Sequence, residues 1–353
     1  MSAQQDAPLE TLFLPFAQGL LRWPTGHALF LRARDGWPLR QHVAGGGLLC
    51  EQSFRPFADA LERAGWDVLG EAAIEAAGPR HPLVLVLPPR QRDEARALLA
   101  RAVALAAPGG VVVACQANNE GAKSGEGDLR QLAGLGGQLT KHHCRVYWTA
   151  PLHGTHDAAL QARWLALDAS RPILGGRFSS RPGVFAWDRV DAASALLAEH
   201  FPDDLAGHGA DLGAGYGYLS SELLRRCPQI RALDLYEAEA RALALARGNL
   251  HAFEDKVRLG YHWHDVTTGL GGSFDFIVSN PPFHAPSREA RPDIGRRFIE
   301  AAARALRPGG RLLLVANRHL PYEQVLDAQF GTVRVLAERD GFKVIAATRG
   351  GRA

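Results

Sequence analysis

The sequence predicts two α/β domains in tandem, each with a doubly wound, mostly parallel β-sheet covered by helices on both faces. Strand-like and helix-like segments alternate from about residue 207 onward, and such alternation is typical of a parallel sheet. A weaker copy of the same pattern occurs in the first half of the chain. At 353 residues the chain also exceeds one ordinary domain. We expect the domains to span residues 1–165 and 166–353.

The second half contains the clearer pattern. We expect strands from about residue 207, up to Glu237, near Val257 and Phe274, and at 311–316, and helices at 220–226, 238–249 and 294–306. The C-terminal segment VRVLAERDGFKVIAATR predicts a hairpin that turns at Asp340 and Gly341. This hairpin would reverse the direction of the last strand.

An internal repeat links the two halves. Each contains a strand, a Pro-Pro pair, a helix, a Pro-Gly-Gly turn and a second strand. In the first half, however, Leu87 precedes the Pro-Pro pair where the second half has Asn280, and the upstream stretch 53–70 lacks alternating glycines. We therefore interpret the first domain as a degenerate copy that has lost its ligand.

Composition limits the class of protein. A hydrophobic content of 46% and a charged content of 22% are typical of a soluble globular chain. The N-terminus lacks the basic and apolar regions of a signal peptide, and no apolar run reaches the roughly 18 residues of a membrane span. The cysteines and histidines show no metal-ligand spacing. We expect a cytoplasmic protein without metal, and its net charge of +3 is compatible with a nucleic-acid partner.

A glycine-rich loop predicts the ligand. Asp211, Gly213, Gly215 and Gly217 alternate between an apolar strand and a helix, so the backbone can approach a ligand closely and the helix N-terminus offers free N–H groups. A dinucleotide fingerprint would need a sixth-position glycine where Tyr218 stands. The spacing instead suits S-adenosylmethionine, whose cationic amino group Asp211 could attract directly or through water. A glycine-rich loop alone can also be a structural turn.

Two further carboxylates follow successive strands. Glu237 ends the next strand and could accept both ribose hydroxyls of this cofactor, while Asp265 follows a third strand and could accept from its adenine amine. Either residue alone would equally fit a solvated cap. Their order along the chain, however, brings both side chains to the carboxyl edge of a parallel sheet, where ligands bind.

The segment FDFIVSNPPFH predicts the chemistry. Its strand ends at Asn280, Pro281, Pro282 and Phe283. The Asn280 side-chain oxygen and the Pro281 carbonyl can both accept hydrogen bonds from one exocyclic amine, and Phe283 offers a ring on which a base can stack. The prolines make the segment rigid and remove donors. Such a site would favour methylation of an amine on a planar base, although Asn and Pro also occur in ordinary turns.

Four arginines follow this tetrapeptide and could hold phosphates beside an extruded nucleotide. They are Arg288, Arg291, Arg296 and Arg297. A solvated helix face explains the same residues equally well.

Taken together, these motifs resemble the tandem-domain bacterial ribosomal RNA guanine-N2 methyltransferases, the RsmC-like group. The resemblance covers nearly the whole chain. It is carried by NNEGAKS at 118–124, GVFAWDRVDAASALLAEHFP at 183–202, DLGAGYGYLS at 211–220, SNPPFH at 279–284 and VANRHLPYEQVLDAQFG at 315–331.

The resemblance implies two class I methyltransferase (Rossmann-like) domains. The C-terminal one would use S-adenosylmethionine and release S-adenosylhomocysteine, and the N-terminal one would assist folding or RNA recognition without binding cofactor. It also implies that the segment 183–191 folds over the cofactor, with Phe185 and Asp191 as contacts. Direct transfer to guanine N2 would place Asn280 and Pro281 on the amine and require no strong general base.

We expect the substrate to be 16S ribosomal RNA, within the 30S subunit, and the enzyme to be a monomer. Four alternatives remain open at this point. The related enzymes of 23S ribosomal RNA share the motifs, an adenine-N6 methyltransferase could use the same tetrapeptide, and a glutamine methyltransferase would more usually have Tyr at the position of Phe283. From a different class, the chain could be a non-catalytic RNA-binding protein of ribosome assembly.

Overall fold

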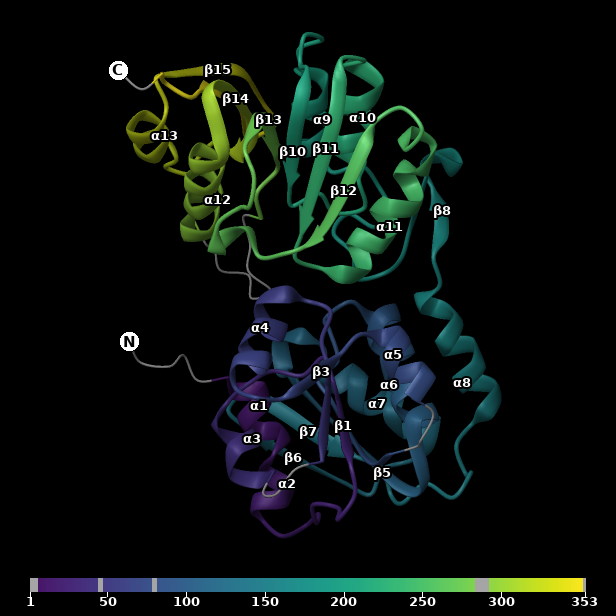
Figure 1. Ribbon diagram of the computed structural model, residues 1–353. Coiled ribbons are helices and arrows are strands. Elements are labelled where there is room, and N and C mark those ends of the chain that lie inside the picture. Colours follow the sequence, from purple (N-terminus) through teal and green to yellow (C-terminus); the bar gives the residue numbers. More distant parts are fainter. Residues whose placement is uncertain (1–5, 44–46, 78–80, 283–291, 352–353) are drawn as a thin grey trace. The chain divides into compact units, whose positions relative to one another are not determined.

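A computed structural model of the chain describes residues 6–43, 47–77, 81–282 and 292–351 (Figure 1). The chain forms two compact units. The first comprises Met1–Ser170 and Arg181–Gly183, and the second comprises Arg171–Ser180 and Val184–Ala353. The chain therefore passes from the first unit to the second, returns briefly, and passes over again.

Each unit contains a seven-stranded sheet, and the two sheets have the same strand order. In the second unit this order is β12 (Arg258–Trp263), β11 (Ile230–Glu237), β10 (Gly207–Leu212), β13 (Phe274–Ser279), β14 (Leu306–Asn317), β16 (Phe342–Thr348) and β15 (Thr332–Arg339). In the first unit it is β3 (Asp67–Leu69), β2 (Leu48–Glu51), β1 (Ala28–Leu31), β4 (His81–Val86), β5 (Ala106–Ala117), β7 (Cys144–Trp148) and β6 (Gly137–Lys141). This identity of order confirms the predicted repeat of one fold.

The second sheet is parallel from β12 through β14, and β16 joins antiparallel to both β14 and β15. The hairpin turn between β15 and β16 lies at Asp340 (φ 53°) and Gly341 (φ 83°), where two successive positive φ angles suit a two-residue hairpin. The predicted reversal of the last strand is thus confirmed.

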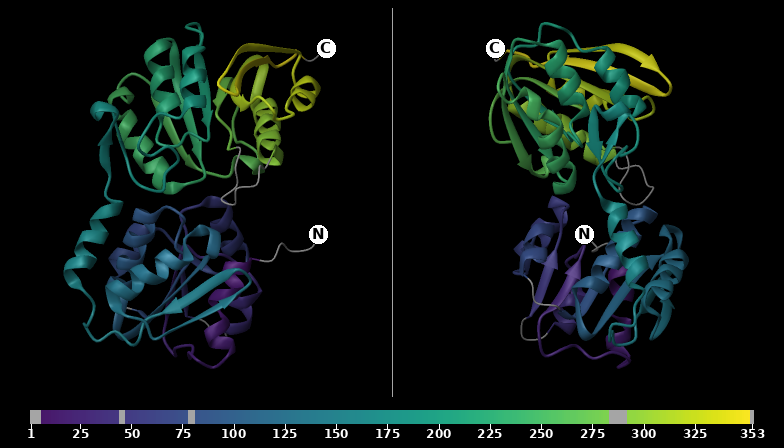
Figure 2. Two further views of the ribbon diagram at one scale, coloured as in Figure 1. Left: turned by 180° about the vertical axis from the view of Figure 1, so that it is seen from behind. Right: turned by 90° about the vertical axis from the view of Figure 1, so that its right-hand side faces the viewer.

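Helices cover both faces of this sheet, as the two views of Figure 2 show. One face packs against α9 (Ala192–Glu199), α10 (Tyr218–Arg226) and α11 (Ala240–Leu250), and the other against α12 (Pro292–Ala305) and α13 (Glu323–Gln329). Alternate strand residues supply the two cores: Phe276 and Val278 face the first set of helices, whereas Ile277 faces the second. This alternation follows from the two-residue period of a strand.

The first unit is layered in the same way. Its described helices are α1 (Ala7–Leu12), α2 (Leu14–Ala17), α3 (Trp37–His42), α4 (Arg55–Arg63), α5 (Glu71–Ala77), α6 (Arg92–Leu105), α7 (Ala122–Ala133) and α8 (Ala158–Leu165). A short hairpin of β8 (Arg171–Ile173) and β9 (Phe178–Ser180) lies at the start of the second unit.

Element boundaries differ modestly from the expected ones. The strand expected at 311–316 extends over Leu306–Asn317, because β13 and β14 pair again on the far side of an irregularity between Phe274 and Phe276. The helix expected at 220–226 begins two residues earlier, at Tyr218.

A substitution at Gly295 tests how tightly α12 packs against the loop before α13. A Cβ atom at Gly295 would lie 1.8 Å from the hydroxyl of Tyr322, which is fully buried and whose oxygen has no partner in the described part of the chain. We predict that Gly295→Ala lowers the free energy of unfolding by roughly 1–3 kcal/mol through overpacking, despite the better helix propensity of alanine. Urea denaturation measures the change.

Gly248→Ala in α11 is the matched control, since nothing lies within 4 Å of the added Cβ. It should stabilise by roughly 0.5–1 kcal/mol. The loss of unfolding free energy in Gly295→Ala should be smaller when this substitution is combined with Tyr322→Phe. Equal effects at the two glycines would contradict this packing.

Candidate functional site

The site lies where the central parallel strands β10 and β13 end. Leu212 pairs with Ser279 at the last register position, and the buried Ser279 hydroxyl donates to the Leu212 carbonyl at 2.8 Å. The next residues of the two strands are Gly213 and Asn280. The register therefore brings the glycine loop and the Asn-Pro-Pro segment together at one edge of the sheet.

Hydrogen bonds from the neighbouring strand hold the glycine loop. Gly213 (φ 76°) and Gly215 (φ 56°) lie in the left-handed region, which favours glycine. The Gly213 and Ala214 N–H groups donate to the Tyr236 carbonyl at 2.8 and 3.2 Å. A Cβ atom added at Gly215 would meet nothing within 4 Å, so this glycine faces open space. Gly217 then caps the N-terminus of α10.

Asp211 is a fully buried carboxyl group beneath this loop. Its Oδ2 accepts a hydrogen bond from the Ser220 hydroxyl at 2.6 Å, whereas its Oδ1 has no partner among the described residues. Burial raises the pKa of Asp211 to about 7, and the negative charge of Glu237 adds to this rise. An unpaired buried oxygen is costly, and a cationic or hydrogen-bond-donating ligand, or a bridging water, would satisfy it.

Glu237 anchors the loop. Its Oε2 accepts from the Gly215 N–H and its Oε1 from the Glu239 N–H, both at 2.8 Å. Burial raises the pKa of Glu237, against the opposing effect of these N–H donors. Asp265 begins the short 3₁₀ turn Val266–Thr268, and its Oδ1 accepts from the N–H and the hydroxyl of Thr267. Both carboxylates thus lie at strand ends and organise local backbone.

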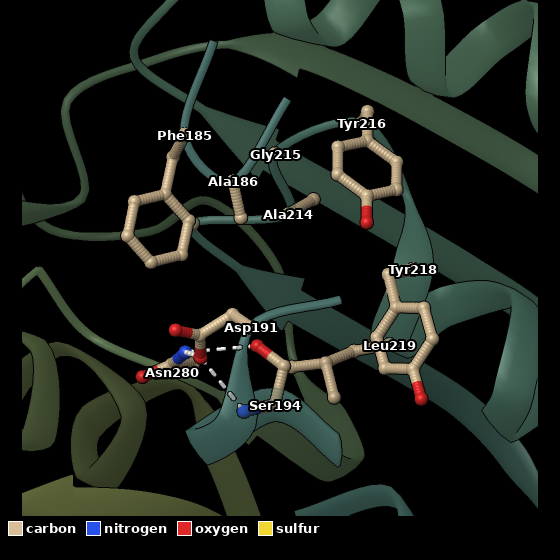
Figure 3. Close-up of a pocket in the computed structure, with 11 residues that line it drawn as sticks. Phe185, Ala186, Asp191, Ser194, Ala214, Gly215, Tyr216, Tyr218, Leu219 and Asn280 are labelled. Atoms are coloured by element: carbon tan, nitrogen blue, oxygen red, sulfur yellow. Dashed lines mark hydrogen bonds between the residues drawn. The ribbon is translucent and has the colours of Figure 1, made fainter. Parts of the chain in front are cut away.

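Only the nitrogen end of the Asn280 side-chain amide is hydrogen-bonded to described residues. Its Nδ2 donates to the Asp191 Oδ2 at 2.9 Å and to the Ser194 hydroxyl oxygen at 2.8 Å. Its Oδ1 is buried and has no partner among the described residues. Asp191 also caps α9, because the same Oδ2 accepts from the Ser194 N–H at 2.9 Å. Figure 3 shows these three side chains grouped at one side of a pocket, with the Phe185 ring across from them.

The pocket joins several of the predicted residues. It is open to solvent and encloses about 410 Å³ when that open space is counted. Its walls are formed by Phe185, Ala186, Asp191, Ser194, Gly213, Ala214, Gly215, Tyr216, Tyr218, Leu219 and Asn280. Asp211, Gly217, Glu237 and Asp265 are not among the residues that line it.

Three sets of contacts around the site went unrecognised in the sequence. Ser194 holds Asn280. The Tyr216 hydroxyl donates to the Arg189 carbonyl at 3.1 Å and so fastens the segment 184–191 to the glycine loop. Asn249 donates to the Tyr216 carbonyl and pairs with the backbone of Ser179. The one available signal was the position of Tyr216 between two of the alternating glycines.

The remaining predicted residues divide into two groups. Pro281 is buried, Pro282 is exposed, and Arg296 and Arg297 lie exposed on α12. Phe283, Arg288 and Arg291 lie outside the described residues.

Within the described ranges, no helix is both long and apolar enough to cross a membrane. The same part of the chain contains no group of three or more His, Cys, Asp or Glu residues arranged to hold a metal ion.

Comparisons with known proteins identify relatives of this chain. A family model described as the methyltransferase small domain matches residues 175–346. The Yersinia pestis (strain Pestoides F) protein named ribosomal RNA small subunit methyltransferase C is 31% identical over 262 residues, which cover 74% of this chain and 73% of that protein. The Sodalis glossinidius protein of the same name is 32% identical over 288 residues, or 79% of each chain.

Among solved structures, the 16S rRNA N2 guanine methyltransferase of T. thermophilus is similar over 99% of this chain and 93% of its own, with a TM-score of 0.77 and 26% identity. That structure was determined in complex with AdoMet and guanosine.

The pKa of Asp211 predicts a pH effect on stability. Because the folded pKa (about 7) exceeds the unfolded value (3.8), the folded state binds more protons between these values, and the free energy of unfolding falls as pH rises through this window. Asp211→Asn removes this contribution, of at most about 1.4 kcal/mol per pH unit. Urea denaturation of the ligand-free protein at several pH values measures it.

Asp275→Asn is the control of opposite sign, since hydrogen bonds from the His208 N–H and Arg307 lower the pKa of Asp275 despite its partial burial. The Asp275 carboxylate stabilises the folded state at pH values above its unfolded pKa. This stabilisation is lost as the pH falls through the lowered folded pKa. An unchanged pH slope in Asp211→Asn would show that Asp211 does not titrate in this range.

Proposed function

The chain belongs to the ribosomal RNA small subunit methyltransferase C family, and from this premise we propose that it transfers a methyl group from S-adenosylmethionine to the exocyclic N2 amine of a guanine in 16S ribosomal RNA. The observation that carries the proposal is the shared pocket of the glycine loop and Asn280, whose free Oδ1 is an acceptor for an amine. The similar T. thermophilus enzyme was solved with AdoMet and guanosine, the two ligands that such a pocket requires.

The residues present fit the cofactor. Gly215 faces open space in the pocket, so a ligand can approach its backbone. The orphan Oδ1 of Asp211 suits the cationic amino group of the cofactor, directly or through water. We assign the ribose to Glu237, the adenine amine to Asp265 and a covering contact to Phe185, whose side chain is 67% exposed over the pocket.

Asn280 and Pro281 supply the chemistry of the target side. The lone pair of guanine N2 is delocalised into the ring, so the free amine is a poor nucleophile. The Asn280 Oδ1 and the Pro281 carbonyl would accept its two hydrogens and favour the pyramidal form, whose lone pair is available to attack. The rigid Pro281 and Pro282 hold these acceptors in place, and we assign stacking on the base to Phe283.

Positioning of the cofactor methyl group and the target amine provides most of the rate enhancement in the proposed mechanism. When bound, S-adenosylmethionine supplies an electrophilic methyl group on a sulfonium and leaves as S-adenosylhomocysteine. The N2 proton becomes acidic once the new N–C bond forms and passes to solvent, so no strong base is required. Alignment of two reacting groups can contribute roughly 7–11 kcal/mol.

The N-terminal unit serves a different purpose in this proposal. Leu31 pairs with Val86 as Leu212 pairs with Ser279, so Leu87 takes the place of Asn280. Glu51, at the end of β2, is paired with Arg101 rather than with a glycine loop. These features support a degenerate domain that assists folding or RNA recognition.

We further propose that the enzyme acts as a cytoplasmic monomer on the 30S subunit. Arg296 and Arg297 would then contact phosphates near the target, together with Arg288 and Arg291. The exposure of the first two on α12 supports this role.

The substrate assignment predicts a specific product. The purified protein, given labelled S-adenosylmethionine and unmodified 30S particles, 50S particles or free 16S and 23S RNA, should form N2-methylguanosine in 16S RNA, most of it in 30S particles. Nucleoside analysis measures this. Methyladenosine, or label in 23S RNA alone, would contradict the assignment.

Two variants separate the target from the cofactor. Asn280→Ala should lower turnover roughly a hundredfold, because the amine is no longer positioned, and leave the affinity for S-adenosylmethionine nearly unchanged. Gly215→Arg should abolish cofactor binding, because its side chain fills the pocket, and leave RNA binding intact. Calorimetry and single-turnover kinetics make the comparison, and near-normal turnover in Asn280→Ala would refute the role of this residue.

A further inference from the structure

We propose that Asp191 is a positioning residue that determines which end of the Asn280 amide faces the target base. The inference rests on the proposed function and deepens it, because it identifies what makes the site an acceptor for an amine. Asp191 would thus act through Asn280, and its contribution is separable from a contact with the cofactor.

The hydrogen bonds of Asn280 are divided unequally between its two ends. Both hydrogens of Nδ2 are used, one on the Asp191 Oδ2 and one on the Ser194 hydroxyl oxygen. Oδ1 is buried, and no described residue donates to it. Asn280 lines the pocket, and Oδ1 is the end of its amide that is not bonded to any described residue.

The chemistry of the two partners shows which of them sets this orientation. A hydroxyl can donate or accept, so Ser194 would bond to either end of the amide. An ionised carboxylate only accepts. Turning the amide over would place Asn280 Oδ1 against Asp191 Oδ2, leaving two acceptors in contact and two buried donors to be satisfied elsewhere. Asp191 alone therefore discriminates between the two orientations.

Asp191 is itself held firmly. Its Oδ2 caps α9 through the Ser194 N–H, and α9 buries Ala193, Leu196 and Leu197 against the sheet. The preceding segment is fastened at the Arg189 carbonyl by Tyr216. A carboxylate with so little freedom can impose one orientation on its neighbour, as a catalytic site requires.

The consequence is selectivity for an amine. In the observed orientation, the unbonded Asn280 Oδ1 and the Pro281 carbonyl are both acceptors, which match an NH₂ group. With Nδ2 outward, the same residue would present donors, which match a base carbonyl and oppose an amine. The single oxygen of Asp191 thus decides which exocyclic group the pocket accepts.

Asp191→Ser and Asp191→Asn form a matched pair of variants. Serine and asparagine both cap helices about as well as aspartate, so α9 should persist in each. We expect the shorter serine to cap α9 without reaching Asn280, whereas asparagine should keep an oxygen at the cap and therefore an acceptor for Nδ2. We expect kcat to fall about tenfold in Asp191→Ser, from loss of a charge-assisted hydrogen bond, and to stay within about threefold of wild type in Asp191→Asn.

A double-mutant cycle with Asn280→Ala provides the decisive readout, because residues that act through one another are not additive. Asp191→Ser should cause no further loss of kcat in the Asn280→Ala background, and the affinity for S-adenosylmethionine should stay within about twofold throughout. A loss that persists in that background, or a weaker cofactor affinity with unchanged kcat, would overturn the proposal and make Asp191 a cofactor contact.

A second measurement does not depend on activity. The side-chain amide signals of Asn280 in NMR spectra, identified by their absence in Asn280→Ala, should exchange slowly with solvent in wild type and Asp191→Asn, and rapidly in Asp191→Ser. Equal exchange in all three would overturn the proposal. A wild-type protein that forms no N2-methylguanosine would instead refute the proposed function, and this NMR comparison would still test the role of Asp191.

Discussion

The parallel pairing of β10 with β13 is the constraint on which the site depends. Leu212 and Ser279 are paired across these central strands and joined by a buried side-chain hydrogen bond. Because both strands end here, the glycine loop and Asn280 emerge beside one another. A one-residue shift in register would move the side chains of the shifted strand to the opposite face of the sheet, so the cores on the two faces also fix the geometry of the pocket.

Unsatisfied buried polar groups at this edge of the sheet lower the stability of the ligand-free protein, and in the proposed function they are available to bind ligands. Asp211 leaves one oxygen without a partner and has a pKa raised to about 7 by burial. Asn280 likewise leaves its Oδ1 unsatisfied. Natural interiors leave few such atoms, and the proposed function assigns these two oxygens to ligands. Glu237, by contrast, is satisfied by backbone N–H groups and rigidifies the loop.

Local patterns in the sequence were sufficient to predict much of this arrangement. The alternating glycines, the Asn-Pro-Pro segment and the Asp340-Gly341 turn each depend on residues close in sequence, and the repeated Pro-Gly-Gly segments predicted two copies of one fold. The contacts of Asn280 with Asp191 and Ser194 could not be predicted in this way, because they join residues 89 and 86 positions apart. Asp191 was expected beside the cofactor and lines the pocket, but its bonds to Asn280 and to the N-terminus of α9 were not foreseen.

The measurement that tests the account most directly is a crystal structure of this protein with S-adenosylhomocysteine and guanosine bound. We predict that the guanine N2 lies within hydrogen-bond distance of the Asn280 Oδ1 and the Pro281 carbonyl, while Nδ2 remains on Asp191. A guanine whose O6 or ring edge faces Asn280, or a cofactor bound away from Gly213 and Gly215, would contradict the central claim.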